Sequence, residues 1–370
     1  MSKSKIRYPL IKPFIESKEI NNVMSALKSG WISANGAFVP KFEKLFSKYL
    51  KGGHAVAVSS GTSALQLGLA TLSIGKGDQV IVPNFTFGAC INSIIHCGAT
   101  PVLVDVERET WTIDLKKLKK SVTSFTKAIM IVHIYGQPCK IDAIRKFARK
   151  NKLLIIEDCA EAIGAKYKNR LIGLDGDCSC FSFVPSKTIT TGEGGMVVFK
   201  NKKKAEKAKL LRSHGISFNE SYWHKEAGFN FRMTNLQAAL GVAQMGKIKK
   251  LIGQRKKIFN YYDLKLKNYK KISLLPSNNW SENSYWLYTI TLNNIGEKKR
   301  DKILVNLLKK GIETKPVFYP LNRMMPYKKY SKGSYNISNY LSANSLSLPS
   351  SGITRNAQDY IIESLIKEIN

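Results

Sequence analysis

The sequence has few histidines, few acidic residues and no long apolar run. Its 370 residues include five histidines and 26 acidic side chains against 59 Lys and Arg, so the formal net charge is +33. It has no Cys-x-x-Cys pair and no His/Cys cluster with zinc spacing. No stretch approaches the length of a membrane span, and the start, MSKSKIRYPLIKPF, lacks the apolar core of a signal peptide. These absences predict a cytoplasmic protein without a metal site.

The cysteines give no sign of a disulfide framework. Most lie in apolar surroundings, where a thiol behaves as a small hydrophobic group, and they are Cys90, Cys97, Cys139, Cys159, Cys178 and Cys180. This pattern suits a reducing compartment.

The excess of positive charge has two interpretations. A field of this size attracts anions such as nucleic acid or a phosphorylated small molecule. However, the lysine runs at 116–120, 200–209 and 247–250 are not interleaved with aromatic residues in a nucleic-acid-binding pattern. We therefore predict solvated surface lysine that helps to steer anions. A basic nucleic-acid-binding regulator stays as the alternative from a different class.

The order of apolar segments predicts an α/β fold. In the first two thirds, apolar strands such as 79–83, 100–106 and 152–158 alternate with helices. This alternation is typical of a mainly parallel sheet covered on both faces. One early helix has an apolar face made of Ile20, Val23, Met24 and Leu27.

From about residue 250 the pattern changes to a lysine-rich helix, an alternating strand at 285–292 and an amphipathic helix at 300–311. Its alternation predicts a half-buried strand. We therefore expect a large α/β domain at 1–248 and a small α+β domain at 249–370.

Two charged residues follow predicted core strands. Asp158 ends the apolar segment LLIIED, and Lys187 lies in the segment FSFVPSKTITTGEGGMVVF. Asp158 alone fits a helix cap or a structural ion pair, and Lys187 alone fits a surface turn. Active sites of parallel sheets lie beyond the carboxyl ends of strands, and a partly desolvated lysine can form a Schiff base. Together they predict a cleft in which Asp158 is the counter-ion of a bound cation.

A third segment, SSGTSAL at 59–65, predicts an anion site. A strand, a turn of small residues and a helix start expose free backbone N–H groups, although a helix cap explains the same residues. The three segments fit one cofactor, pyridoxal 5'-phosphate. Its aldehyde would meet Lys187, its pyridine nitrogen Asp158, and its phosphate Gly61 and Thr62.

The chain also resembles a known family from about residue 8 to about residue 350. The matching motifs include SSGTSALQL, GDQVIVPNFTF, IEDCAEAIGAKYK, FSFVPSKTITTGEGGMV, GFNFRMTNLQAALG and IETKPVFYPL. They resemble the DegT/DnrJ/EryC1/StrS family of pyridoxal-phosphate-dependent sugar aminotransferases, and most closely its perosamine-synthase branch. The resemblance implies a fold like that of aspartate aminotransferase (fold type I), with the small α+β domain at the C-terminus.

The resemblance implies roles for individual residues. Lys187 matches the Schiff-base lysine, and Asp158 matches the acid that pairs with the pyridinium nitrogen. Glu161 matches the polar position beside the phenolic oxygen of the cofactor, and Phe87 matches the aromatic ring that stacks on the pyridine. The implied phosphate binders are Gly61, Thr62, Ser182 and, from the partner subunit, Asn230.

The resemblance also implies a reaction. Relatives move an amino group from L-glutamate to a keto nucleotide sugar and act as homodimers with shared active sites. Branches that aminate C3 tend to carry Gln at the position of Glu161, so this chain is expected to aminate C4 of a 4-keto-6-deoxy sugar, with a C3-aminotransferase as the alternative. Pro185-Ser186 replaces the Gly-Asn of close relatives. The nucleotide and the sugar stereochemistry therefore stay open.

Overall fold

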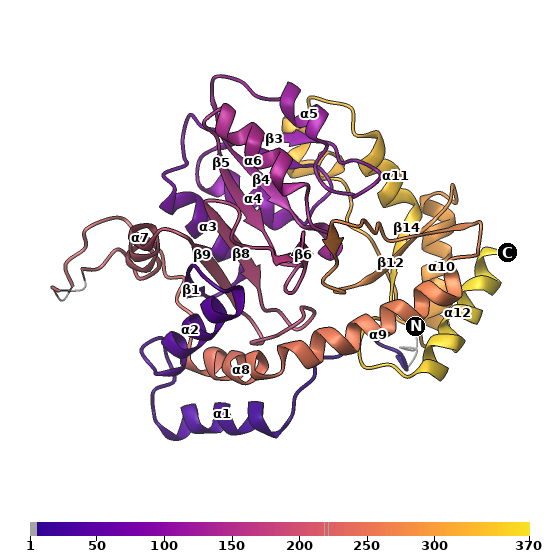
Figure 1. Cartoon of the computed structure of the whole chain (residues 1–370), viewed down its shortest axis with the longest axis horizontal. Coiled ribbons are helices and arrows are strands. Elements are labelled where there is room, and N and C mark those ends of the chain that lie inside the picture. Colours follow the sequence, from indigo (N-terminus) through magenta and orange to yellow (C-terminus); the bar gives the residue numbers. More distant parts are fainter. Residues whose placement is uncertain (1–5, 218, 221) are drawn as a thin grey trace.

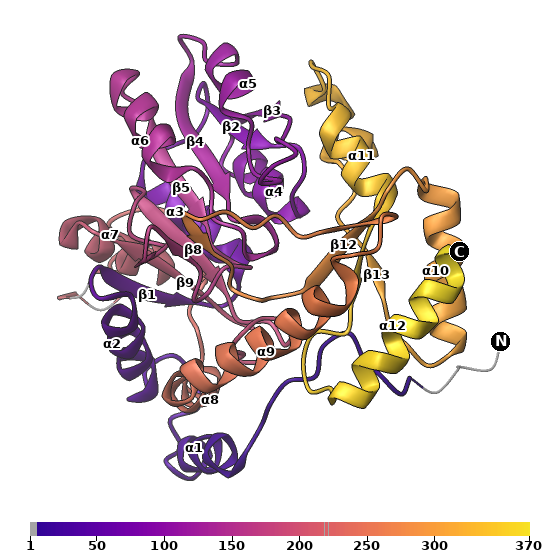
Figure 2. The same cartoon turned by 45° about the vertical axis from the view of Figure 1, so that its right-hand side comes forward.

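The structure is a computed structural model that describes residues 6–217, 219–220 and 222–370 (Figures 1 and 2). A seven-stranded sheet with the order β1-β9-β8-β5-β4-β2-β3 forms its centre. Only β9 runs against its neighbours, so the predicted mainly parallel sheet is confirmed. The strands are β1 (His54–Val58), β2 (Gln79–Pro83), β3 (Thr100–Val104), β4 (Thr126–Val132), β5 (Leu154–Asp158), β8 (Cys178–Ser182) and β9 (Gly195–Phe199).

Helices cover both faces of this sheet because side chains alternate along each strand. In β1, Val56 and Val58 enter one hydrophobic core, whereas Ala55 and Ala57 enter the other. The helices of this region are α2 (Phe38–Leu50), α3 (Gly61–Thr71), α4 (Gly88–His96), α5 (Leu115–Lys120), α6 (Ile141–Lys150), α7 (Lys202–Arg212) and α8 (Asn235–Gly246), with the 3-10 turn η1 (Ile134–Gly136).

The C-terminal part is built on a second, antiparallel sheet, at the right of Figure 1. Its order is β10-β12-β14-β13, from β10 (Ile272–Leu274), β12 (Tyr288–Leu292), β13 (Lys315–Pro316) and β14 (Ser345–Leu348). Its helices are α9 (Ile248–Leu266), α10 (Glu297–Lys309), α11 (Asn336–Asn344) and α12 (Arg355–Ile369), with η2 (Leu321–Arg323) and η3 (Met325–Tyr330). A small three-stranded sheet joins β6 (Lys166–Tyr167), β7 (Arg170–Leu171) and β11 (Ser281–Glu282).

The prediction of a half-buried strand at 285–292 was wrong. All five residues of β12 are buried. Tyr288, Ile290 and Leu292 enter the C-terminal core as the alternation predicted. The opposite face is buried as well, because Thr289 and Thr291 form hydroxyl pairs with Ser347 and Ser345 on β14, at 2.9 and 2.8 Å. A polar residue in a strand pattern therefore does not imply an exposed position.

The chain start packs on the C-terminal part. The backbone N–H groups of Arg7 and Tyr8 each donate to the Gly311 carbonyl at 2.9 Å, and that of Leu10 donates to Glu313 Oε2 at 2.8 Å. Helix α8 ends at Gly246 and α9 begins at Ile248. We propose that the two expected domains, 1–248 and 249–370, divide at this junction, with the first residues crossing over to the second.

Helix α1 (Ser17–Lys28) leaves its apolar face in solvent. The exposed fractions of Ile20, Met24 and Leu27 are 56%, 44% and 46%. The side that packs against α8 carries instead Glu19 and Ala26, and Glu19 forms an ion pair of 2.8 Å with Lys247. Within the described ranges, we find no helix that is both apolar enough and long enough to span a bilayer.

Candidate active site

Asp158 is the last residue of β5, in the middle of the central sheet. Its side chain is buried, with 7% of the residue exposed. The Ala160 N–H donates to Oδ1 at 2.9 Å, and the Cys90 thiol donates to Oδ2 at 3.0 Å. The strand therefore delivers an oriented carboxylate to the carboxyl end of the sheet, as the sequence predicted.

Lys187 and Glu161 lie at the same end of the sheet. Lys187 follows β8, and its Nζ lies 3.9 Å from Glu161 Oε1, with both side chains largely buried. The other carboxylate oxygen of Glu161 accepts a hydrogen bond of 2.6 Å from the backbone N–H of Tyr135. The Lys187 Nζ also lies 3.8 Å from the ring centroid of Trp286. The amine is thus enclosed by a carboxylate on one side and an aromatic face on another.

Burial sets the electrostatics of this group. Desolvation lowers the pKa of Lys187, and the guanidinium of Arg255 acts in the same direction, while Glu161 and Asp158 oppose it. Desolvation raises the pKa of Glu161 to about 7, although the charge of Lys187 pulls it down. Burial thus moves the two pKa values toward each other, upward for Glu161 and downward for Lys187.

Gly61 begins helix α3 and faces the end of β8. A Cβ on Gly61 would lie 2.8 Å from the Cβ of Ser182. A Cβ on Gly195 would overlap the Ser60 carbonyl, so the turn before α3 can approach both strands only because these residues lack side chains. Ser60 caps the helix by accepting from the Ser63 N–H at 3.0 Å. A phosphate would fit between the backbone N–H groups of the first turn of α3 and the hydroxyl groups of Thr62 and Ser182.

The two remaining predicted residues lie differently. Phe87 precedes α4 and is 62% exposed, with its ring 5.8 Å from that of Phe318. Cys90, one turn further on α4, contacts Asp158, so Phe87 lies at the same end of the sheet. Asn230 is exposed and forms a β-bridge with Ser213, the residue that follows α7. No hydrogen bond among the described residues joins Asn230 to Lys187 or Asp158.

Sequence reasoning missed three residues of this site. Cys90 was interpreted as a small hydrophobic residue, but its thiol donates to Asp158. Trp286 was assigned to a strand, but it precedes β12 and packs under Lys187. Arg255 was not singled out, but it donates to the Lys187 carbonyl at 2.9 Å. Each contact joins segments far apart in sequence, and the only local signal is an arginine within a lysine-rich helix.

Another polar cluster lies in the interior. His133, Glu157 and Cys159 bring metal-ligand atoms close together. Glu157 already accepts hydrogen bonds from the N–H groups of Gly173, Asp175 and Gly176 and from the Ser179 hydroxyl, and His133 Nδ1 accepts from the Cys139 N–H. Burial raises the pKa of Cys159 to about 12, so its thiol stays protonated. These donors are typical of a structural network rather than a metal centre.

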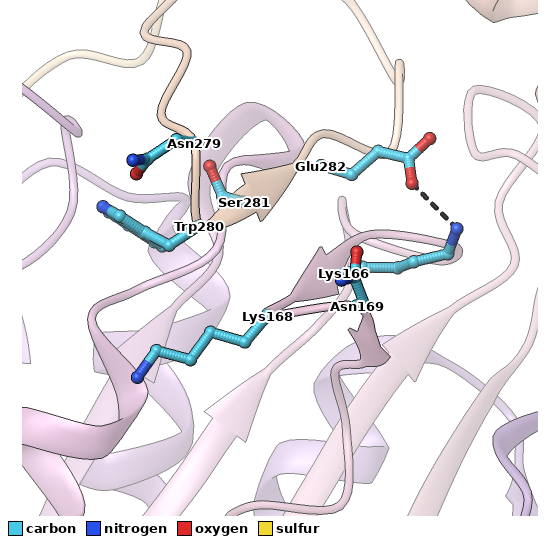
Figure 3. A pocket seen from close by; sticks show the side chains of 7 residues that line it. All are labelled: Lys166, Lys168, Asn169, Asn279, Trp280, Ser281 and Glu282. Atoms are coloured by element: carbon cyan, nitrogen blue, oxygen red, sulfur yellow. Dashed lines mark hydrogen bonds and ion pairs between the residues drawn. The ribbon is translucent and has the colours of Figure 1, made fainter.

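Two open pockets lie on the surface. One, of about 340 Å³, is shown in Figure 3, where Lys166 reaches Glu282 at 2.8 Å on one side and Trp280 and Asn279 lie on the other. The other, of about 560 Å³, lies beside His214 and His224 in the segment that follows α7. Neither is lined by Lys187 or Asp158, so neither belongs to the predicted site.

Comparison with known proteins identifies the family. Residues 13–366 match the DegT/DnrJ/EryC1/StrS aminotransferase family. The chain belongs to this family. Two similar relatives are named GDP-perosamine synthase. That of Caulobacter vibrioides is 40% identical, over 97% of each chain. That of Vibrio cholerae is 38% identical, over 92% of this chain and 93% of the relative.

Solved structures agree with the family match. The putative sugar aminotransferase Spr1654 from Streptococcus pneumoniae, in its PMP form, gives a TM-score of 0.94 at 29% identity. The match covers 98% of this chain and 97% of the other. The predicted fold class and enzyme class, a pyridoxal-phosphate-dependent sugar aminotransferase, are confirmed. Transamination is thus favoured over a nucleic-acid-binding regulator.

The residues present fit the cofactor of this family. The site combines a buried carboxylate, a desolvated lysine and a helix start that packs closely on Ser182. A Cβ at position 61 would collide with the Ser182 side chain and push this helix start away. These are the groups that a pyridine nitrogen, an aldehyde and a phosphate require. The chain therefore agrees with the family both in its sequence and in the chemistry of its site residues.

Proposed function

We propose that this protein transfers an amino group from L-glutamate to C4 of a 4-keto-6-deoxy nucleotide-diphosphate sugar. One observation carries the proposal: a buried Lys187 amine lies 3.9 Å from Glu161 at the sheet edge where Asp158 ends β5. Similarity to two relatives named GDP-perosamine synthase, over almost the whole chain, supports the nucleotide-sugar substrate. Glu161, in place of the Gln typical of C3-aminating branches, supports C4.

The proposed roles follow from the contacts. Lys187 would hold the cofactor covalently through Nζ, and Asp158 would keep the ring nitrogen protonated. Phe87 would cover one face of the ring. The α3 start, with Gly61 and Thr62, and Ser182 on β8 would hold the phosphate. When bound, pyridoxal phosphate supplies a carbonyl that carries the amino group and a ring that accepts negative charge.

Proton transfer is the task of Lys187. In the first half-reaction its Nζ would take the proton from the α-carbon of glutamate, which would leave as 2-oxoglutarate after its amino group passes to the cofactor and water supplies the keto oxygen. In the second half-reaction its Nζ would deliver a proton to C4 of the sugar as that carbon receives the amino group and its keto oxygen leaves as water. A lowered amine pKa suits this role, because it makes the neutral amine that accepts a proton easier to form. Glu161, with a pKa of about 7, can take up or release a proton beside it.

Exposed apolar residues support a homodimer. Ile20, Met24 and Leu27 on α1 are 44–56% exposed, and Trp31 just after it is 60% exposed. Burying such side chains against a second copy would remove about 25 cal/mol of unfavourable free energy per Å². Asn230, which has no hydrogen bond to Lys187 or Asp158 among the residues that the structure describes, would then reach the phosphate of the partner.

The proposal is tested by product identity. The protein, loaded with pyridoxal phosphate, is incubated with L-glutamate and a panel of 4-keto-6-deoxy sugars carrying GDP, dTDP or UDP. We expect one to be aminated at C4, as shown by mass spectrometry and by NMR of the product. A second panel holds the corresponding 3-keto sugars. Amination at C3 of one of them would establish the alternative regiochemistry, and no aminated sugar from either panel would refute the proposal.

A further inference from the structure

Helix α9 places a buried arginine beside the lysine segment. Arg255 is 6% exposed, and its two terminal nitrogens donate to the carbonyls of Trp286 and Lys187, each at 2.9 Å. In the part of the chain that the structure describes, no ion pair joins this guanidinium to a carboxylate. Two backbone carbonyls thus satisfy two donors but leave the positive charge uncompensated.

A buried charge without a counter-ion is costly. Burial lowers the pKa of Arg255 only to about 10, so the guanidinium is still charged at neutral pH. A nearby positive charge disfavours a second cation. Arg255 therefore acts on Lys187 in two ways, by holding its backbone and by opposing protonation of its amine.

Trp286 completes the arrangement. Its indole Nε1–H donates to the Ser186 carbonyl at 2.8 Å, and its ring lies 3.8 Å from Lys187 Nζ. The ring is itself fixed by stacking on Tyr135, with centroids 5.7 Å apart. Consecutive carbonyls at 186 and 187 are thus held by two side chains of the C-terminal part, and the lysine chain runs along an aromatic surface.

We propose that Arg255 is a positioning residue for Lys187. Its guanidinium donates to the Lys187 and Trp286 carbonyls, fixes the lysine backbone beside the indole, and brings an uncompensated positive charge to the backbone of the residue that carries the ε-amine. The inference rests on the proposed role of Lys187 as the residue that holds the cofactor. The charged groups that act on this amine are Glu161 and Asp158, beside β5, and Arg255.

Three variants separate the two effects. Arg255→Gln removes the charge and one of the two donors. Arg255→Lys keeps the charge but cannot reach both carbonyls with a planar fork. Trp286→Phe keeps an aromatic face but removes the donor to Ser186. The control is Lys256→Gln, which removes a positive charge one position along the same helix, from an exposed side chain paired with Glu282.

The readout is the visible absorbance of the lysine-bound cofactor, titrated against pH in the intact holoenzyme, together with kcat and KM. We expect Arg255→Gln to move the titration midpoint to higher pH and to lower kcat by about 10- to 100-fold with little change in KM, because the lysine is misplaced. Arg255→Lys should restore the midpoint but not kcat. Trp286→Phe should lower kcat at an unchanged midpoint, and Lys256→Gln should alter neither.

An unshifted midpoint with normal kcat in Arg255→Gln overturns the proposal. If that variant does not fold, the kcat values of Arg255→Lys and Trp286→Phe decide it, and a normal kcat in both overturns the proposal as well. The absorbance titration needs no sugar. A wild type that binds the cofactor at Lys187 but aminates no nucleotide sugar would therefore refute the proposed function and leave this test intact.

Discussion

Lys187 Nζ lies 3.9 Å from Glu161 Oε1, and both side chains are largely buried. Burial raises the pKa of Glu161 from 4.5 to about 7. As pH rises above 4.5, the unfolded chain releases this proton first, so the folded state loses stability until the pH passes about 7. Glu161→Gln should therefore stabilise the cofactor-free enzyme by on the order of 1–3 kcal/mol at about pH 8 and by almost nothing at about pH 4.

Urea unfolding at the two pH values measures this difference. The control is Glu363→Gln, at an exposed position on α12, which should change stability little at either pH. An equal effect of Glu161→Gln at both pH values would show that the carboxylate is not desolvated.

Lys187 should be the residue that carries the cofactor. Lys187→Ala should lower kcat by about 100- to 10 000-fold, because it removes the group that transfers the proton. Lys187→Arg keeps the charge but should be equally inactive, since a guanidinium neither condenses with an aldehyde nor gives up its proton readily. Borohydride reduction, digestion and mass spectrometry identify the labelled peptide in the wild type. A label on any other lysine would contradict the assignment.

The thiol of Cys90 should stabilise Asp158. Burial, together with the charge of Asp158, raises the pKa of Cys90, so it remains a thiol donor. Cys90→Ala should cost about 1.5–3 kcal/mol of unfolding free energy, because a charged acceptor loses its partner. Cys90→Ser, which keeps a donor, should recover part of this loss. Cys178→Ala, which removes an equally buried thiol, is the control, and an equal loss in both alanine variants would rule out a special role.

The sequence predicted the positions of those candidate site residues that lie at strand ends. Asp158 ends an apolar segment and Lys187 follows another, and parallel strands bring their carboxyl ends to one edge of the sheet. Gly61 was predictable for the same reason, because a strand, a turn and a helix start form a local unit. The order of apolar and polar residues within each segment was enough to place these residues in the fold.

The contacts between distant segments were not predictable. Arg255 reaches the Lys187 carbonyl across 68 residues of chain, Trp286 reaches the Ser186 carbonyl across 100, and Cys90 reaches Asp158 across 68. Hydrophobic periodicity predicts which face of a helix or strand is apolar, but it does not predict which other segment packs against that face. The apolar face of α1 shows the same limit, because it was expected from the pattern and is exposed in the single chain.

The exposed face of α1 should hold two copies of the chain together. Met24→Glu combined with Leu27→Glu places charges in an interface that would otherwise exclude water, so the dimer should dissociate. Sedimentation or light scattering should give the mass of two chains for the wild type and of one chain for the variant. Ser25→Glu adds charge on another side of α1 and should leave the dimer intact. A wild type with the mass of one chain would contradict the homodimer.

The charge of +33 should speed the capture of the nucleotide sugar. Both proposed substrates are anions, and long-range attraction between exposed charges is largely screened once the Debye length falls to about 8 Å at 0.15 M salt. We expect kcat/KM for the sugar to fall by about tenfold or more as KCl rises from about 20 mM to about 500 mM, with kcat nearly constant. Sucrose at matched osmolality should have no such effect. Steering by charge cannot persist once the field is screened. A kcat/KM that does not respond to salt would therefore mean that the lysines are solvated surface groups that do not speed substrate capture.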